Sequence, residues 1–496
     1  MDRTEVDLAI TLDPSGGQLP VQLADAVRDL ITHGVLRPGE RLPASRPLAA
    51  RLGTSRGTAV AGIDQLVAEG YLVPVRGSGT VVNPDLALIH PTARAALVRP
   101  PRSAVERDAD PTPGPVLTGQ DVIDLRPGQP DVRAVAGSAW RQAWRTAAAD
   151  PGTGGTDPAG LPELRTELAA HLRQMRGVLV SPADLLVTAG ARDGLATLLH
   201  VLAERRGHRL IIAVEDPGYP SLRQVPTRLG ATVVPIGVDG SGLMVQRLEG
   251  LGRHSRPDLV IVTPSHQYPL GASMTVTRRL ELLDWAGRSD AVVVEDDYDS
   301  ELRYVGAPLP ALAALDRRDS PGGERVVTLG SFSKTVTPAL GAGFVVLPEP
   351  LQQPVVDYRG DIGPVVSGVV QRALSEYLKA GGLRRHTQRM RRDYRRRRQI
   401  VADALGGIGS VTVRGMDGGL HAVVEWSQAI NQARLVNDRL HDDGVLVGSL
   451  SDYWARSTLG DAAVRYGLVI GYAGLDDTTL SRALVRVRSV LQHSAG

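Results

Sequence analysis

RVVTLGSFSKTVTP, residues 325–338, contains a short apolar run that ends in hydroxyl side chains and a lysine. Three other runs have the same form: LIIAVEDPGY (210–219), LVIVTPSHQ (259–267) and AVVVEDDYD (291–299). Almost wholly apolar runs suit strands buried on both faces, and the helical segments between them favour a mainly parallel sheet. Ligands bind such sheets beyond the carboxyl ends of the strands. The polar ends of these runs are therefore predicted to form one site.

Lys334, in the first of these stretches, is one of only two lysines among the 56 Lys and Arg residues of the chain. Arginine can replace lysine in most ion pairs, but its guanidinium does not readily lose a proton and act as an amine nucleophile. The other lysine, Lys379, lies near a predicted helix end, where positive charge is favourable. Lys334 is therefore predicted to act as an amine, as in a Schiff base with pyridoxal 5'-phosphate (PLP).

PLP also needs a carboxylate for its ring nitrogen, a donor for its ring hydroxyl and an anion site for its phosphate. Asp296, at the end of one apolar run, is predicted to supply the carboxylate, and Tyr298 the donor. The phosphate site is predicted at the start of a helix that follows a strand, in TAGARDGL (188–195). Its predicted members are Gly190, Ala191, Arg192, Ser331 and Ser333.

Length and composition limit the classes of protein. A chain of 496 residues is too long for one core, so at least two domains are expected. The absence of cysteine excludes disulfides and thiolate metal sites, and the histidines show no metal-binding constellation. No apolar run approaches the length of a membrane span, and we expect a cytoplasmic protein with no membrane partner.

The first 83 residues are predicted to form a small domain of three helices and a hairpin. The helices are expected at 20–34, at 45–53 with Ser45 as N-cap, and at 54–70 behind a Ser/Thr cap. The hairpin is expected at 71–83. This order is typical of a winged helix-turn-helix, which places its last helix in the major groove of DNA.

Basic side chains gather in this small domain. Residues 37–76 hold six arginines against three acids, although the net charge of the whole chain is only +2. LRPGERLPASRPLAARLGTSRGTAVAGIDQLVAEGYLVPVRGSGTVV (36–82) resembles the winged-helix head of GntR-type bacterial regulators. The resemblance implies that the head binds a double-stranded DNA operator. The implied contacts are Arg46, Ser55, Arg56, Thr58 and, in the wing, Gly77.

The rest of the chain resembles a second family, the fold-type-I aminotransferases. The phrases that carry this are DPAGLPELR (157–165), EDPGY (215–219), TPSHQYPLG (263–271), EDDYDSELRY (295–304) and GSFSK (330–334). With its GntR-type head the chain is similar to the MocR subfamily. The resemblance implies Lys334 as the Schiff-base lysine, with four further cofactor contacts: Asp296 at the ring nitrogen, Tyr298 near the ring hydroxyl, Ser331 at the phosphate and Tyr219 beside the ring.

The expected organisation has three parts. Residues 1–83 are the winged head, 84–119 a Pro-rich linker, and 120–496 an α/β aminotransferase-like domain. The last part is expected to have a mainly parallel sheet and a smaller C-terminal α+β subdomain from about residue 385. An arginine-rich segment at 383–398 is either a second DNA-binding surface or a helix with one buried apolar strip.

Two departures from the family pattern concern the cofactor. Gly341 stands where family members have an arginine that binds the phosphate, and Gly155 where they have a tyrosine that reaches across a dimer. Both changes weaken the expected affinity for PLP, and Arg192 is a candidate to compensate.

Three functions fit these features. The first is a DNA-binding regulator that senses an amine, an amino acid or PLP through its aminotransferase-like domain, as a homodimer with exchanged heads. The alternatives are a PLP-dependent aminotransferase with a DNA-binding head, and a regulator whose pocket no longer binds PLP. We expect effector sensing rather than catalysis.

Overall fold

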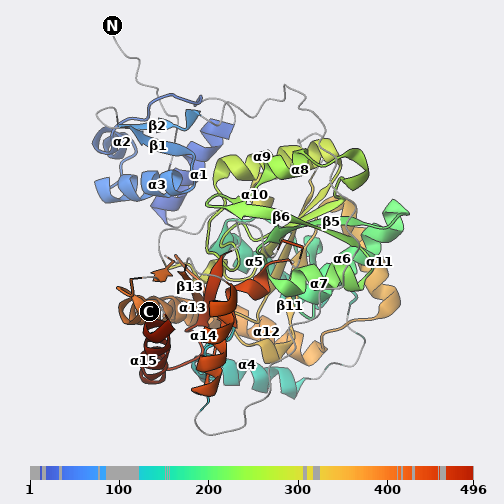
Figure 1. The fold of residues 1–496 in the computed structure, drawn as a ribbon. Helices are drawn as coiled ribbons and strands as arrows, with labels where there is room; N and C mark the ends of the chain where they lie inside the picture. The colour runs from blue at the N-terminus through green and yellow to red at the C-terminus, as the bar shows by residue number, and fades with distance from the viewer. Residues whose placement is uncertain are drawn as a thin grey trace. The chain divides into compact units, whose positions relative to one another are not determined.

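The computed structural model describes residues 10, 12–13, 18–32, 36–75, 79–84, 122–150, 152, 155, 157–304, 310–316, 324–409, 411–414, 417–426, 430–455, 457–458 and 465–494. The chain divides into two compact units, one that contains the N-terminal head and one that contains an α/β body (Figure 1). Apart from Pro84, the predicted linker lies outside the described residues, and so does Gly77.

The head consists of three helices and a hairpin, as predicted. Its elements are α1 (Leu19–Thr32), α2 (Ser45–Arg51), α3 (Arg56–Ala68), β1 (Leu72–Val75) and β2 (Gly79–Val82). The two strands are antiparallel, with Leu72 opposite Val82. Arg28 of α1 donates a hydrogen bond to buried Glu69 at 2.8 Å, which ties the first helix to the end of the third.

The caps of α2 and α3 differ from each other. The prediction of Ser45 as a cap is wrong, because α2 begins at Ser45 and its N-cap is Ala44. A cap at Ser45 would need the amide of residue 47 or 48; Pro47 has no N–H, and the Leu48 amide already binds Ala44 O. Ser55 does cap α3, since its hydroxyl accepts the Thr58 amide at 3.0 Å.

The body is built on an eight-stranded sheet in the order β4-β11-β10-β9-β8-β5-β6-β7. The four apolar runs of the sequence form β5, β8, β9 and β10, which run parallel to one another as predicted. Only β11 and β7 run antiparallel. The strands are β4 (Leu185–Thr188), β5 (Ile211–Asp216), β6 (Thr232–Asp239), β7 (Gly242–Leu243), β8 (Leu259–Val262), β9 (Val292–Asp297), β10 (Val326–Ser331) and β11 (Gly343–Val346).

Helices cover both faces of this sheet. Leu186 of β4 packs with α6 (Ala191–Arg206), α7 (Pro220–Arg228) and α11 (Glu349–Ile362). Its neighbours Leu185 and Val187 point to the opposite face, against α4 (Ser138–Ala149), α5 (Pro162–Arg176) and α12 (Gly368–Lys379). Shorter helices of the body are α8 (Val245–Glu249), α10 (Leu312–Leu315), and the 3-10 turns η3 (Pro182–Asp184), η4 (Arg253–Ser255), η5 (Ser300–Leu302) and η6 (Pro338–Leu340). Helix α9 (Val276–Ser289) is divided between the units, with residues 275–284 in the unit that contains the head.

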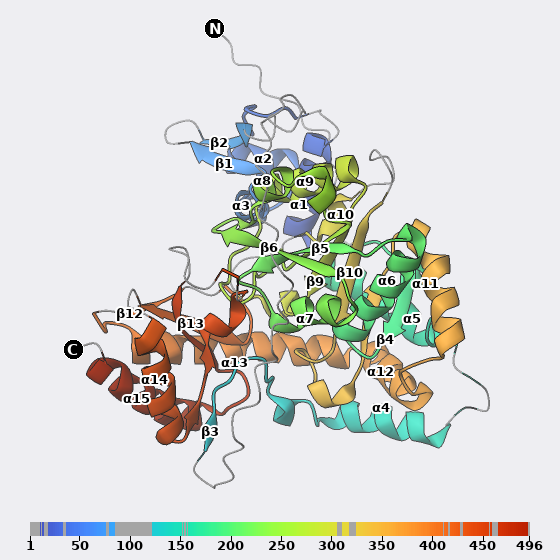
Figure 2. The same cartoon turned by 45° about the vertical axis from the view of Figure 1, so that its right-hand side comes forward.

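A smaller α+β subdomain forms the C-terminal part of the body (Figure 2). Its sheet has the order β12-β13-β16-β15. The elements are α13 (Gly382–Leu405), β12 (Val411–Val413), β13 (His421–Trp426), α14 (Ile430–Asp442), β14 (Val445–Leu446), β15 (Gly448–Ser449), η7 (Leu450–Tyr453), β16 (Tyr466–Gly471) and α15 (Asp477–Ser494). In the described part of the chain, no helix is both long and apolar enough to cross a bilayer.

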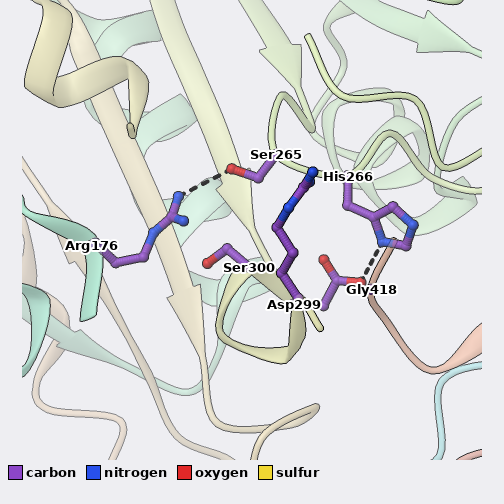
Figure 3. A pocket seen from close by; sticks show the side chains of 7 residues that line it. Arg176, Ser265, His266, Asp299, Ser300 and Gly418 are labelled. Carbon is purple, nitrogen blue, oxygen red and sulfur yellow. Dashed lines mark hydrogen bonds and ion pairs between the residues drawn. The ribbon is translucent and has the colours of Figure 1, made fainter. Parts of the chain in front are cut away.

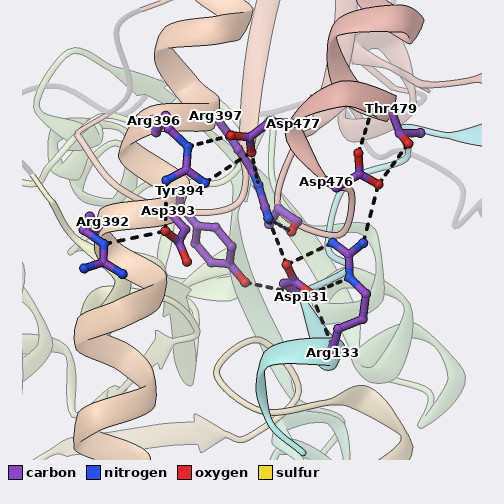
Figure 4. Close-up of polar contacts among 11 residues, drawn as sticks. Asp131, Arg133, Arg392, Asp393, Tyr394, Arg396, Arg397, Asp476, Asp477 and Thr479 are labelled. Atoms are coloured by element: carbon purple, nitrogen blue, oxygen red, sulfur yellow. Dashed lines mark hydrogen bonds and ion pairs between the residues drawn. The ribbon is translucent and has the colours of Figure 1, made fainter.

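A segment from before the large sheet also packs on this subdomain, which the sequence did not reveal. Strand β3 (Ile123–Asp124) pairs in parallel with β14, and η2 (Val132–Ala134) follows it. Figure 4 shows the ionic contacts of this segment. Buried Asp131 binds Arg397 of α13 at 2.9 Å, and Arg397 also binds Asp477 of α15 at 3.1 Å.

The arginine-rich segment forms the long helix α13. Its buried side chains recur every three or four residues, among them Met390, Tyr394, Val401 and Leu405. Arg391 donates to the carbonyl of Glu301 at 2.6 Å, and Arg397 is buried. These contacts favour the helix with one buried apolar strip over a second DNA-binding surface.

We expect Arg397→Met to destabilise the protein far more than Arg396→Met, the matched control at the next position. The first change removes one of the two arginine partners of buried Asp131, the other being Arg133, and the loss of this charge-assisted contact should cost about 1.5–3 kcal/mol. Arg396 is half exposed, and its loss should cost about 1 kcal/mol or less. Thermal unfolding followed by circular dichroism measures the difference; equal midpoints would show that the Asp131–Arg397 pair does not hold the segment.

Candidate functional site

The carboxyl ends of β9 and β10 bring Lys334 and Asp296 together. The two strands are adjacent and parallel, with Leu329 opposite Asp296. Lys334 lies three residues beyond the end of β10, and its positive charge acts on Asp296, Tyr219 and His421. The predicted amine and the predicted carboxylate therefore belong to one site.

The Lys334 amine is hydrogen-bonded to the segment that packs on the C-terminal subdomain. Its Nζ donates to the carbonyl of Gly128 at 2.8 Å. Gly128 has a φ of +100°, and a Cβ atom at this position would lie 2.6 Å from Nζ. Only glycine fits both conditions, so the backbone at 128 is shaped for the amine.

The carboxyl group of Asp296 is buried and accepts no side-chain or loop hydrogen bond from the described part of the chain. Burial, followed by the nearby Asp297, Asp299 and Glu215, raises the pKa of Asp296 to about 8, although Lys334 opposes the shift. A carboxyl in this state gains most from a cation bonded directly to it, and no such bond is made by the described residues. The protonated ring nitrogen of PLP is such a partner, so the site fits the cofactor that the sequence implies.

Tyr298 is held by its neighbour His266. The tyrosine hydroxyl donates to the His266 carbonyl at 3.0 Å, and the two rings stack with centroids 6.1 Å apart. His266 Nδ1 in turn binds Asp299 at 2.6 Å. Figure 3 shows this pair at a polar hollow whose other lining residues include Arg176, Ser265 and Ser300. His266 is thus held beside Tyr298 by a ring contact and a hydrogen bond.

Tyr268 is the centre of an aromatic cluster next to Lys334. Its ring centroid lies 4.8 Å from His421, 5.3 Å from Tyr453, 5.4 Å from Tyr219 and 5.6 Å from Tyr298. Tyr219 and Tyr298 were predicted, whereas the other three were missed. Tyr268 stands inside a phrase that already pointed to the site, but His421 and Tyr453 come from the C-terminal subdomain and carry no local signal.

The charges in this cluster are set by burial and by neighbouring cations. Burial, His266 and Lys334 lower the pKa of His421 to about 4, so its imidazole is neutral. Burial alone would raise the pKa of Tyr219, but Lys334, Ser221 and Arg192 outweigh it and leave the pKa below its usual value. Tyr219 therefore lies within the electrostatic reach of two cations.

The predicted phosphate residues also meet at the edge of the sheet. Ser331 Oγ donates to Ser333 Oγ at 2.9 Å and accepts the Ser333 amide at 3.1 Å. A Cβ on Gly190 would lie 3.8 Å from Ser331 Oγ, and α6 begins at the next residue, Ala191. Hydroxyls and the amides of a helix N-terminus thus lie side by side, an arrangement that suits an anion.

The two glycines that depart from the family pattern both face open space. Gly341 follows η6 with a φ of +55°, and a Cβ there would meet no atom within 4 Å. The same holds for the space around exposed Gly155. Neither position therefore offers a cofactor contact within this chain.

The candidate DNA contacts lie at the starts of two helices of the head. Arg46 and Arg56 are exposed in the first turns of α2 and α3. Ser55 and Thr58 are bonded to each other through their hydroxyls at 2.9 Å. The described residues contain no group of three or more side chains that could bind a metal ion.

Two family models match the chain. Residues 19–82 match "Bacterial regulatory proteins, gntR family", and residues 120–487 match "Aminotransferase class I and II".

Individual proteins show the same two-part likeness. The "HTH-type pyridoxine biosynthesis transcriptional regulator PdxR" of Corynebacterium glutamicum is 42% identical over 97% of this chain and 98% of its own length. The "Probable rhizopine catabolism regulatory protein MocR" of Rhizobium meliloti is 33% identical over 94% of this chain and 92% of its own. An archaeal alanine:glyoxylate aminotransferase shares the fold of the body, with a TM-score of 0.67 at 21% identity over 76% of this chain and 92% of its own.

We expect Asp296→Asn to stabilise the cofactor-free protein at high pH. The folded state holds the Asp296 proton up to a pH of about 8, whereas the unfolded carboxyl loses it near pH 4. The contribution of Asp296 to wild-type stability must therefore fall as the pH rises from about 4 through 8, and an amide removes this loss. The melting temperature of the variant, relative to wild type, should be higher at pH 8.5 than at pH 5.5.

Asp403→Asn, a change at an exposed carboxylate, is the control for this pH series. It should change the melting temperature by a similar amount at both pH values. A pH-independent difference for Asp296→Asn would show that the carboxyl is already ionised in the folded protein.

Proposed function

The chain belongs to the MocR subfamily of GntR-type transcription regulators, and from this premise we propose that its body binds PLP at Lys334 and senses a small molecule there. The regulator itself is a DNA-binding protein with a helix-turn-helix head and an aminotransferase-like domain. The observation that carries the proposal is a lysine amine just beyond β10 together with a buried carboxyl on the neighbouring strand β9 that accepts no side-chain hydrogen bond from the described residues.

Each part of PLP has a counterpart among the described residues. Asp296 would bind the ring nitrogen, Tyr219 would lie beside the ring, and Tyr298 would lie near the ring hydroxyl. Ser331, Ser333 and the first amides of α6 would bind the phosphate. The cofactor supplies an aldehyde that reacts with primary amines, while the chain supplies the amine and the buried cavity wall.

We propose PLP itself as the effector. The relative at 42% identity is named for pyridoxine biosynthesis, the synthesis of the same vitamin, and this supports the choice over an amine or an amino acid. A ligand that binds one conformation of the body more tightly must shift operator affinity by the same coupling free energy. We further propose a homodimer with exchanged heads, so that two heads bind two half-sites.

Lys334 should form a covalent bond with PLP. PLP added to the purified protein should give a saturable near-visible absorption band, which Lys334→Ala should lose, because only an amine can form the bond. Lys379→Ala is the matched control, since it removes the only other lysine, and it should keep the band. A band that survives in Lys334→Ala but not in Lys379→Ala would overturn the assignment.

Arg56, in the first turn of α3, should contact DNA. Duplexes selected from a random pool by the wild-type protein should bind Arg56→Ala about tenfold more weakly, because an arginine contact to DNA is lost. Arg228→Ala removes the same charge from an exposed site on the body and should bind normally. PLP should change the wild-type affinity for the same duplexes; turnover of amino acids without any PLP effect on DNA binding would favour an enzyme instead.

A further inference from the structure

We propose that Arg192 binds the phosphate group of the cofactor in this chain and so takes the place of the arginine that is missing at Gly341. This inference rests on the proposed binding of PLP at Lys334. It assigns the main phosphate contact to a helix on one side of the site, rather than to the turn that follows Lys334.

The start of α6 faces the last residue of β10, Ser331, and the first residue of the antiparallel strand β11, Gly343. A Cβ on Gly343 would lie 2.8 Å from the Cα of Gly190, so the backbone of the N-cap touches β11 directly. Ser331, at the end of β10, lies next to the same residue. Gly190, the N-cap of α6, has a φ of +106°. As a glycine it has no side chain, so it makes no side-chain cap hydrogen bond to the first amides of the helix. Arg192, the second residue of α6, therefore stands beside the predicted phosphate residues.

The guanidinium of Arg192 points toward the same ring as the lysine. Its Nη2 donates to Ser221 Oγ, in the first turn of α7, at 2.5 Å. Tyr219, the N-cap of α7, experiences the positive charges of both Arg192 and Lys334. Both cations thus act on one aromatic side chain, the one proposed to lie beside the cofactor ring.

Arg192 also has no carboxylate partner among the described residues. The neighbouring Asp193 is already engaged, since it accepts hydrogen bonds from Arg359 at 3.0 Å and from the Ala189 amide at 3.0 Å. Because Arg192 is exposed and its partners among these residues, Ser221 and Tyr219, are hydroxyl side chains, its charge is available to an added anion. An arginine–phosphate contact is charge-assisted and can be bidentate.

Gly341 cannot make this contact. It has no side chain, and the space around it is open for at least 4 Å from the position of a Cβ. The cation for the phosphate must therefore come from another element. Arg192 is held by Ser221 of α7, and it lies two residues after Gly190, the residue next to Ser331.

The test compares PLP with pyridoxal, which lacks the phosphate. Dissociation constants of both ligands are measured by absorption titration and by native mass spectrometry for the wild type, Arg192→Gln and Arg192→Lys. Arg192→Gln should weaken PLP by about tenfold to a hundredfold and leave pyridoxal unchanged. Arg192→Lys should retain part of the PLP affinity, because it keeps the charge but not the two-pronged geometry.

Arg205→Gln, on the same helix and also exposed, is the matched control and should bind both ligands as the wild type does. Unchanged PLP affinity in Arg192→Gln, or an equal loss of both ligands, would overturn the role of Arg192 while PLP binding by the wild type stands. A wild type that binds neither ligand would instead overturn the proposed function and this inference with it.

Discussion

The burial of four carboxyl groups at one edge of the sheet is the constraint on which the body depends. Three of them have partners: Glu215 binds Thr263, Asp297 binds Arg176, and Asp299 binds His266. Asp296 is the fourth, and its charge is opposed mainly by burial and by these neighbours. Such a cluster of buried carboxyl groups lowers the stability of the cofactor-free protein. A bound cation offsets this unfavourable electrostatic free energy, so the fold favours a cationic ligand.

The sequence predicted the large sheet well because its central strands are buried on both faces. Unbroken apolar runs such as those of β8 and β9 are too short for typical helices and therefore indicate strands. The polar residues at their ends indicated the site. The same reasoning found Lys334 and Asp296, which follow or end such runs. It failed at Ser45, where the missing N–H of Pro47 decided the cap.

Contacts between residues far apart in the chain could not be predicted from one sequence. His421 and Tyr453 reach Tyr268 only because the C-terminal sheet packs beside the large one, and neither lies in a patterned phrase. The segment around Asp131 is short, and neither its pairing with β14 nor its ion pair with Arg397 has a signal in the sequence pattern. Such contacts arise from tertiary packing, which leaves no period in the sequence.

The Lys334–Gly128 contact restricts which substitutions the chain tolerates at position 128. The amine occupies the volume in which any side chain at position 128 would begin. A single nucleotide change at that codon could therefore push the lysine out of place from 206 residues away and leave every residue of the cofactor site intact. The variants that silence such a protein need not lie where its chemistry lies.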